Sequence, residues 1–355
     1  MPAALSKERF HALDLLRGFF IVTIICDHLS RWPSVFGALS GKGLLWITAA
    51  EGFVIISGLL VGYIRGFKGQ HFELKDISLK LWRRALVLYL WAVIGSVVYT
   101  VAIWYLPLAG GAPGMPIAQG DWGHLLFESI SLNYTFVWVY FLKLYAIFLA
   151  FSPLAIWLLR KGRAWIAGLL SLAVLALGWV AHNEILQWQF IFFIPVIAGF
   201  YMPAIQSWWQ RHSRTTRFTI ASAVLGVTII TIIMSMIGTF HPSLSHLLDS
   251  ATVSLFAKDS ISLFRAGVAF LWFVAYLLVF NYLEKYIQRW FGWLLMPIGT
   301  HSLTAYILHG AAIIVISFFF TSSTNIVANS MLGAIAILLV WACLKIPHIN
   351  RVIPR

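Results

Sequence analysis

The sequence predicts an all-α integral membrane protein, and three features lead to that prediction. Of the 355 residues, 61% are hydrophobic and only 10% are charged, whereas soluble domains carry about 25% charged residues. The 17 tryptophans suit a protein with two membrane–water interfaces, where this residue gathers. Long apolar runs recur along the chain. Together these features exclude a soluble enzyme, a disordered chain and a secreted disulfide scaffold.

The apolar runs predict about ten transmembrane helices, because each spanning helix needs about 20 mostly apolar residues. The run that ends near Phe320 is unusually long and contains Pro297, so we expect a bend or an interfacial start there. We expect one transmembrane domain over 1–355, without a separate soluble domain. The predicted spans are 12–29, 44–64, 81–106, 136–159, 164–181, 188–205, 218–238, 263–283, 294–320 and 327–344.

The distribution of basic residues predicts that both termini are cytoplasmic. With that orientation the inner segments hold 19 of the 25 lysines and arginines, and the outer segments hold only Arg31, Lys42 and Lys258. The net charge of +13 therefore reflects membrane orientation, and we predict no nucleic-acid partner. The longest outer loop, 107–135, has no lysine or arginine, and its residues 122–132 are expected to form a short interfacial helix.

Two smaller predictions concern the two cysteines and the first apolar run. Cys26 and Cys343 fall near opposite membrane faces, so we expect no disulfide between them. The first apolar run carries Asp14 and Arg17, and no small-residue cleavage site follows it. We therefore expect an uncleaved first helix rather than a removable signal peptide.

The first span carries the densest set of ionisable residues. Arg17 and His28 are eleven residues apart, which places both on one helix face about 16 Å apart along the axis. Asp14 lies one turn before Arg17 on nearly the same face. The stripe links the cytoplasmic half of the membrane to the outer side. The alternative interpretation is a self-neutralising Asp14–Arg17 pair, with His28 merely at the interface.

Further polar residues have both functional and structural interpretations. Asp27 and Glu51 are carboxylates near the outer end, where a carboxylate can orient an imidazole; Glu51 can instead pair with Arg31 or Lys42. The glycines around Ser57-Gly58 and Gly62 favour close helix packing. Arg83 and Arg84 open the third span and suit either positive-inside anchors or ligands for phosphate groups.

The ninth span contains the polar sequence His301-Ser302-Leu303-Thr304-Ala305-Tyr306-Ile307-Leu308-His309. Ser302 and His309 are seven residues apart and share a face, with Tyr306 between them. His309 lies deep in an apolar run and needs a polar partner, either a substrate or a neighbouring helix. No spacing of His, Cys or carboxylates predicts a metal site, and no glycine-rich phosphate loop occurs.

These residues resemble a known family. The Arg17-x10-His28 spacing is similar to the Arg-x10-His motif of the acyltransferase-3 superfamily. The segment AAEGFVIISGLLVGY at 49–63 resembles the branch that contains the osmoregulated periplasmic glucan succinyltransferases. Further similarities are Leu144-Tyr145 through Pro153, Trp188-Gln189 with Phe193 and Gly199, and Gly299-x-His301-Ser302-Leu303 ending at His309.

The resemblance implies a membrane-embedded O-acyltransferase of the cell inner membrane. Such an enzyme would move a succinyl or acetyl group from cytoplasmic acyl-CoA to a hydroxyl of an extracytoplasmic glycan. His28 would be the catalytic base or the acyl carrier, and Asp27 or Glu51 would orient it. Arg17, Arg83 and Arg84 would bind the acyl-CoA, and a succinyl group would need a cation such as Arg31, Lys42 or Arg265. The candidate substrate-binding residues are His301, Tyr306, His309 and Arg265.

Two other functions fit the same residues. Intramembrane arginine, histidine and glutamate also suit a proton-coupled transporter or exporter of a small polar or glycan-derived solute. A non-catalytic membrane scaffold would tolerate loss of Arg17 and His28. Membrane lipid is an expected partner in every case, and the sequence leaves the acceptor glycan and the oligomeric state open.

Overall fold

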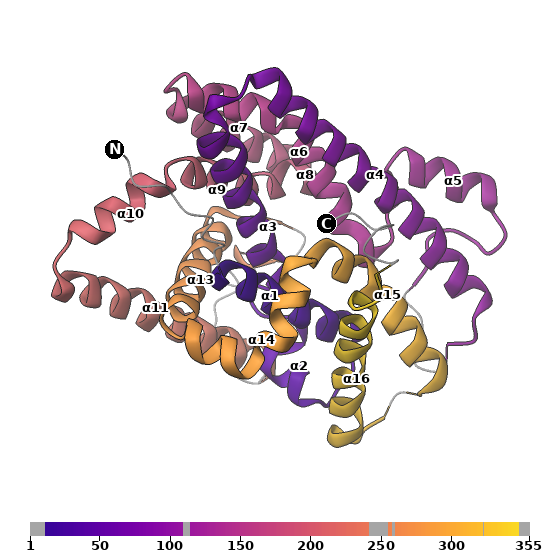
Figure 1. The fold of residues 1–355 in the computed structure, drawn as a ribbon. Coiled ribbons are helices and arrows are strands. Elements are labelled where there is room, and N and C mark those ends of the chain that lie inside the picture. The colour runs from indigo at the N-terminus through magenta and orange to yellow at the C-terminus, as the bar shows by residue number, and fades with distance from the viewer. Residues whose placement is uncertain (1–10, 109–113, 241–254, 258–259, 322, 348–355) are drawn as a thin grey trace.

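The computed structural model describes residues 11–108, 114–240, 255–257, 260–321 and 323–347, and within these residues helices are joined by connections without any strand (Figure 1). The α-helices are α1 His11–Leu29, α2 Val35–Ser40, α3 Ala49–Leu60, α4 Leu74–Tyr105, α5 Trp122–Ile130, α6 Tyr140–Arg160, α7 Ala164–Val180, α8 Glu184–Trp188, α9 Phe190–Phe200, α10 Met202–Arg211, α11 Arg214–Phe240, α13 Leu263–Tyr282, α14 Glu284–Thr300, α15 Ser302–Phe319 and α16 Ile326–Leu344. Three short 3₁₀-helices are η1 Gly41–Gly43, η3 Lys68–His71 and η4 Val137–Val139, and η2 Val61–Phe67 is a π-helix.

Seven helical segments of the described chain are long and apolar enough to cross a membrane, or up to eight with one bent pair. The bent pair joins Glu184–Phe200 to Met202–Arg211 at 64°. The difference from about ten predicted spans has simple causes. The first predicted span is a 19-residue helix that carries Asp14, Arg17 and Asp27, and α7 has only 17 residues. The seven segments are Ala49–His71, Leu74–Tyr105, Val137–Arg160, Arg214–Phe240, Leu263–Tyr282, Ser302–Phe319 and Ile326–Leu344.

The predicted span 294–320 is divided between two helices. α14 ends at Thr300, three residues after Pro297, and α15 begins at Ser302. The amide of His301, between the two helices, donates to the carbonyl of Pro297 over 3.1 Å. The predicted irregularity near Pro297 is therefore present, and it makes Ser302 the first residue of a new helix. The segment expected to form a short interfacial helix is helical and forms α5. Cys26 and Cys343 are both free thiols.

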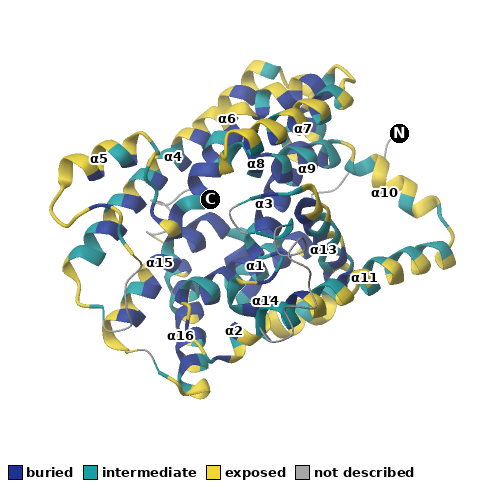
Figure 2. Ribbon diagram, turned by 180° about the vertical axis from the view of Figure 1, so that it is seen from behind, coloured by how far each residue is buried: buried dark blue, intermediate teal, exposed yellow. Residues whose placement is uncertain are grey.

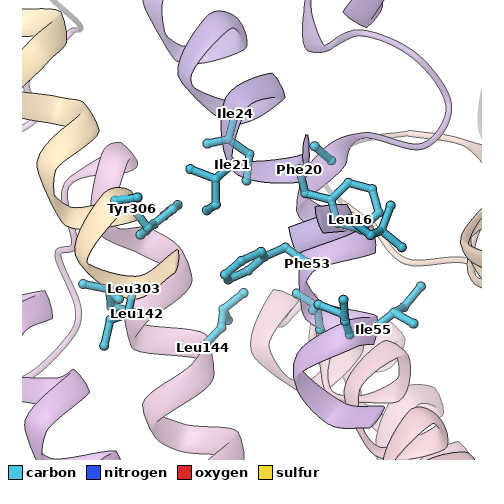
Figure 3. Packing of buried hydrophobic residues seen from close by; sticks show 14 of the residues in the cluster. Leu16, Phe20, Ile21, Ile24, Phe53, Ile55, Leu142, Leu144, Leu303 and Tyr306 are labelled. Carbon is cyan, nitrogen blue, oxygen red and sulfur yellow. The ribbon is translucent and has the colours of Figure 1, made fainter. Parts of the chain in front are cut away.

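The first helix lies in the middle of the structure. α1 packs against α3, α13, α14, α15 and α16, and Figure 2 shows it surrounded by other helices, with buried residues along its length. Its apolar side chains meet those of α3, α6 and α15 in one cluster. Figure 3 shows Leu16, Phe20, Ile21, Ile24, Phe53, Leu144, Leu303 and Tyr306 within that cluster.

Glycines permit the closest helix contacts. A Cβ on Gly18 would lie 2.9 Å from the carbonyl carbon of Leu295 on α14, and a Cβ on Gly299 would lie 2.8 Å from that of Asp14. The contact of α3 and η2 with α9 has the same character, since Gly62 of η2 faces backbone of α9 and Gly199 of α9 faces backbone of α3 and η2. The packing interpretation of the glycines around Gly62 is thus confirmed, and Gly18 lets α14 approach α1 next to Arg17.

Glu51 and Arg265 form a buried ion pair that joins α3 to α13. Nε of Arg265 donates to Oε1 of Glu51 over 3.0 Å, and a second guanidinium nitrogen contacts the same oxygen. The other carboxylate oxygen accepts from the amide of Thr48 over 3.0 Å and from its hydroxyl over 2.6 Å, which completes a capping box at the start of α3. The remaining Arg265 donors reach the carbonyls of Ala257 and Ser260.

This arrangement differs from two sequence-based expectations. Glu51 was expected to orient His28, but both of its oxygens are occupied by Thr48 and Arg265. Arg265 was expected to bind substrate, but its donors are used within the protein and only 3% of its surface is exposed. Both residues therefore stabilise the fold.

We expect Gly18→Ala to destabilise the protein by about 1–3 kcal/mol, because the added methyl group overlaps the backbone of α14. Thermal unfolding in nanodiscs, followed by tryptophan fluorescence, measures the effect. Gly267→Ala on α13 is the matched control, since a Cβ there has nothing within 4 Å. Equal melting temperatures for the two variants would contradict the close α1–α14 contact.

We expect Arg265→Met to lower stability by about 3–5 kcal/mol, because it leaves the carboxylate of Glu51 buried without its cation. The exposed Arg211→Met is the control, and the same melting experiment compares them. A variant at Arg265 that is as stable as the original protein but inactive would return this residue to the substrate-binding set.

Candidate functional site

Two histidines from opposite ends of the chain meet inside the bundle. His28 is next to the last residue of α1, and its Nδ1 lies 2.8 Å from Nε2 of His309 on α15. The ring centroids are 5.0 Å apart and the rings are tilted by 37°. His309 is fully buried, and its Nδ1 also bonds to the carbonyl oxygen of Tyr306. His309, which was expected to bind substrate, is therefore the partner of the predicted base.

The side chain of Tyr306 is held by contacts within the protein. Its ring packs edge-on against Phe141, with centroids 5.6 Å apart, and its hydroxyl accepts the amide of Phe141 over 3.4 Å. The hydroxyl of Tyr99 on α4 donates to the carbonyl oxygen of the next residue, Ile307. These contacts fix the turn of α15 that carries His309. Tyr306 was predicted to bind substrate, and the structure instead places it in the packing around the histidine pair.

Arg17 lies on the same helix as His28 and faces the start of α15. Its guanidinium donates to the hydroxyl of Ser302 and lies 3.9 Å from the carboxylate of Asp14. The side chain keeps 23% of its area accessible inside the bundle, and its Nε is buried without a hydrogen-bond partner among the described residues. An arginine with an unused donor in this position can hold an anionic ligand.

A second arginine, Arg84, lies near Arg17, and a third, Arg65, lies near Arg84. Arg84 on α4 is half-buried and interacts electrostatically with Arg17, with Tyr145 on α6 and with Arg65. Arg65 belongs to the π-helical segment η2, a type of turn often found at functional sites. Arg83, the other predicted donor-binding residue, is exposed. We refer to Arg17, Arg65 and Arg84 as the arginine cluster.

The first turn of α15 adds further unused polar groups beside this cluster. Nε2 of His301 and Oγ1 of Thr304 are buried, and neither has a hydrogen-bond partner among the described residues. His301 holds the carbonyl of Pro297 through Nδ1, over 3.2 Å. The N-terminus of a helix also carries a partial positive charge. His301 was also predicted to bind substrate, and its free nitrogen next to Ser302, which contacts Arg17, is available to a ligand.

Asp27 faces another part of the structure. Its carboxylate packs against Gly43 of η1 and lines a cavity of about 700 Å³ between α1, α13, α14 and α16. The cavity is lined mostly by apolar side chains, and neither Arg17 nor His28 belongs to its lining. Asp27 was predicted to orient His28, whereas the ring of His28 forms its hydrogen bond with His309.

The cations proposed for a succinyl group have internal partners. Arg31 donates to the carbonyls of Phe320 and Thr321 over 2.8 and 2.7 Å, and thus binds the C-terminal end of α15. The ammonium of Lys42 lies 4.1 Å from the ring centroid of Trp32. Within the described residues, no group of three or more His, Cys, Asp or Glu side chains is placed to hold a metal ion.

Sequence reasoning proposed Arg17, His28 and Arg84 for the site. In the structure Arg17 and His28 both contact α15, and Arg84 on α4 interacts with Arg17. Sequence reasoning missed Arg65 and Tyr145. Arg65 was counted only as a basic residue at the cytoplasmic face, and Tyr145 gave a signal only as part of a motif. Neither residue lies on the helices that carry the histidines, so helical periodicity had no means to find them.

The histidine pair, the arginine cluster and the intervening helices fall within one region of similarity. Residues 9–348 match the family model described as OpgC protein. No match was found among curated proteins or among solved structures. Because the family model spans nearly the whole chain, this protein belongs to the OpgC family.

Proposed function

We propose that the protein is a membrane-embedded O-acyltransferase that moves an acyl group from cytoplasmic acyl-CoA to a hydroxyl of an extracytoplasmic glucan. Membership in the OpgC family gives it a transferase-type role in the modification of osmoregulated periplasmic glucans. Beyond family membership, we propose that acyl-CoA is the donor, that the protein lies in the inner membrane and that the family is related to the acyltransferase-3 superfamily.

One observation carries the proposal. A single helix, α1, holds a hydrogen-bonded histidine and an arginine with an unused donor, and both contact α15. The two residues are eleven positions apart, which corresponds to about 16 Å along the helix axis. A base and an anion-binding group at opposite ends of one buried stripe suit a reaction whose two substrates arrive from opposite membrane faces.

The donor end has the chemistry that a CoA thioester requires. The arginine cluster offers planar, permanently charged groups that bind phosphate oxygens in a bidentate manner. Arg84 and Arg65 belong to the face that the basic-residue distribution assigns to the cytoplasm. His301 and the first turn of α15 add polar groups beside Arg17. In the proposed complex the phosphates lie at the arginine cluster and the thioester extends toward His28.

The acceptor end lies within the bundle rather than at its surface. α15 continues for ten residues beyond His309, which corresponds to about 15 Å. A glucan hydroxyl must therefore enter from the outer side to reach His28. Exclusion of bulk water from such a site limits hydrolysis of the thioester.

In the proposed reaction His28 accepts the proton of the glucan hydroxyl while the oxygen attacks the thioester carbonyl. The carbon–sulfur bond then breaks, and the protonated His28 returns the proton to the departing thiolate. The products are an acyl ester of the glucan and free CoA thiol, so atoms and charges balance.

We expect His28→Ala to lower the rate of acyl transfer by about 10²- to 10⁴-fold, the usual contribution of a general base. The measurement is CoA thiol release by the purified protein in nanodiscs, with acetyl-CoA or succinyl-CoA and a panel of linear glucans. The donor that supports release identifies the acyl group. Equal release by both proteins, together with no CoA binding by calorimetry, would refute the proposal and favour transport.

We expect Arg84→Met to raise the KM for acyl-CoA roughly 10- to 100-fold with a smaller change in kcat, since a charge-assisted contact contributes about 1.5–3 kcal/mol. Arg83→Met should have the smaller effect, because its side chain is exposed. The same thiol assay at varied acyl-CoA concentration tests both variants. Equal effects of the two substitutions would contradict the assignment of the arginine cluster to donor binding.

A further inference from the structure

The hydrogen bonds of the histidine pair specify which ring nitrogens carry protons. The carbonyl oxygen of Tyr306 can only accept, so Nδ1 of His309 must be protonated. If His309 is neutral, its Nε2 carries a lone pair. This nitrogen lies 2.8 Å from Nδ1 of His28, so Nδ1 of His28 must be the donor of that bond. The remaining nitrogen of His28, Nε2, then carries the lone pair.

His309 is expected to be neutral because of its surroundings. None of its surface is exposed, and no carboxylate forms an ion pair with it among the residues that the structure describes. Its ring is 5.0 Å from the ring of Tyr306 and 5.0 Å from that of His28, measured between centroids. An unpaired imidazolium in such a position would carry a large desolvation cost.

We propose that His309 is a positioning residue that holds His28 in the Nδ1–H tautomer, so that Nε2 of His28 is the atom that accepts the proton of the acceptor hydroxyl. The order of bonds runs from Nδ1–H of His28 to Nε2 of His309, and from Nδ1–H of His309 to the carbonyl of Tyr306. This inference rests on the proposed function for the identity of the proton donor, but the tautomer itself does not depend on it.

The surrounding residues support a fixed orientation of His309. The hydroxyl of Tyr99 donates to the carbonyl of Ile307. The residue after His309 is Gly310, where a Cβ would lie 2.6 Å from the ring of Tyr99 and 2.9 Å from that of Trp138. α15 can therefore approach α4 closely at the turn that carries His309. A neutral imidazole fills the place that a carboxylate occupies in other histidine-based catalysts.

The direct test is nitrogen-15 NMR of the full-length protein in nanodiscs, with its histidine rings labelled and without substrates. The His28 signals are assigned by their loss in His28→Asn. We expect a protonated Nδ1 and an unprotonated Nε2 at His28, and His309→Phe should remove this preference. A protonated Nε2 at His28 in the original protein would overturn the proposal.

The functional test compares His309→Gln with His309→Phe, because glutamine keeps an acceptor near the position of Nε2. We expect His309→Phe to lower kcat roughly 10- to 100-fold, the range for groups that orient a functional histidine, with little change in the KM for acyl-CoA. His309→Gln should recover most of kcat, and His212→Gln on the connection after α10 is the control. Equal losses in the Gln and Phe variants would reduce His309 to a packing role.

The two experiments separate this inference from the proposed function. The expected His28 tautomer in a protein that releases no CoA from any donor would refute acyl transfer and support the positioning by His309. If acyl transfer requires His28 but Nε2 of His28 is protonated, the proposed function stands and the positioning role of His309 is refuted. If His309→Phe does not fold, the NMR result on the original protein still decides.

Discussion

The structure depends on the burial of the first helix. α1 carries Asp14, Arg17, Asp27 and His28 in a segment of 19 residues, and a charged side chain in the bilayer centre costs at least about 2.5–3.5 kcal/mol. Such a helix cannot face lipid, so other helices must surround it. The close contact at Gly18 and Gly299 brings α14 against one side, and α3, α13, α15 and α16 cover the others. The apolar helices thus enclose a polar one.

The enclosed polar groups fall into two classes with different consequences. Glu51, Arg265 and Arg31 have their hydrogen bonds within the protein and hold segments together. Arg17 and His301 each keep a buried nitrogen without a partner in the described structure. Nε of Arg17 is a donor, whereas Nε2 of a neutral His301 is an acceptor, because Nδ1 of that ring donates to the carbonyl of Pro297. An unsatisfied buried donor or acceptor costs about 1–3 kcal/mol, so stability alone would favour its removal. Other buried polar atoms without a partner are scattered over the described structure, but those of Arg17, His301 and Thr304 lie together where α1 meets α15 and beside the contact between Arg17 and Ser302. This juxtaposition is the reason to assign ligand binding to this region.

Much of the fold could be predicted because apolar length specifies membrane helices and helical periodicity specifies which residues share a face. That reasoning placed Arg17 and His28 on one face and located the irregularity near Pro297. It could not tell which helix lies opposite, since the partner of His28 is 281 positions away in the chain. The expected pairing of Glu51 with His28 failed for the same reason. Local chemistry suggests that a carboxylate orients a histidine, whereas the packing of α3 against α13 directs this carboxylate to Arg265.

The use of a second imidazole rather than a carboxylate has a physical reason in a membrane. A buried carboxylate beside His28 would itself need a cation, as Glu51 needs Arg265, and would add a negative charge where the proposed reaction develops an oxyanion and a thiolate. A neutral His309 leaves the pair uncharged before the reaction. Proton transfer to His28 then creates a single positive charge beside the developing negative charge, where a low dielectric strengthens their attraction. The membrane thus favours an uncharged partner, at the cost of less stabilisation of the imidazolium than a carboxylate would give.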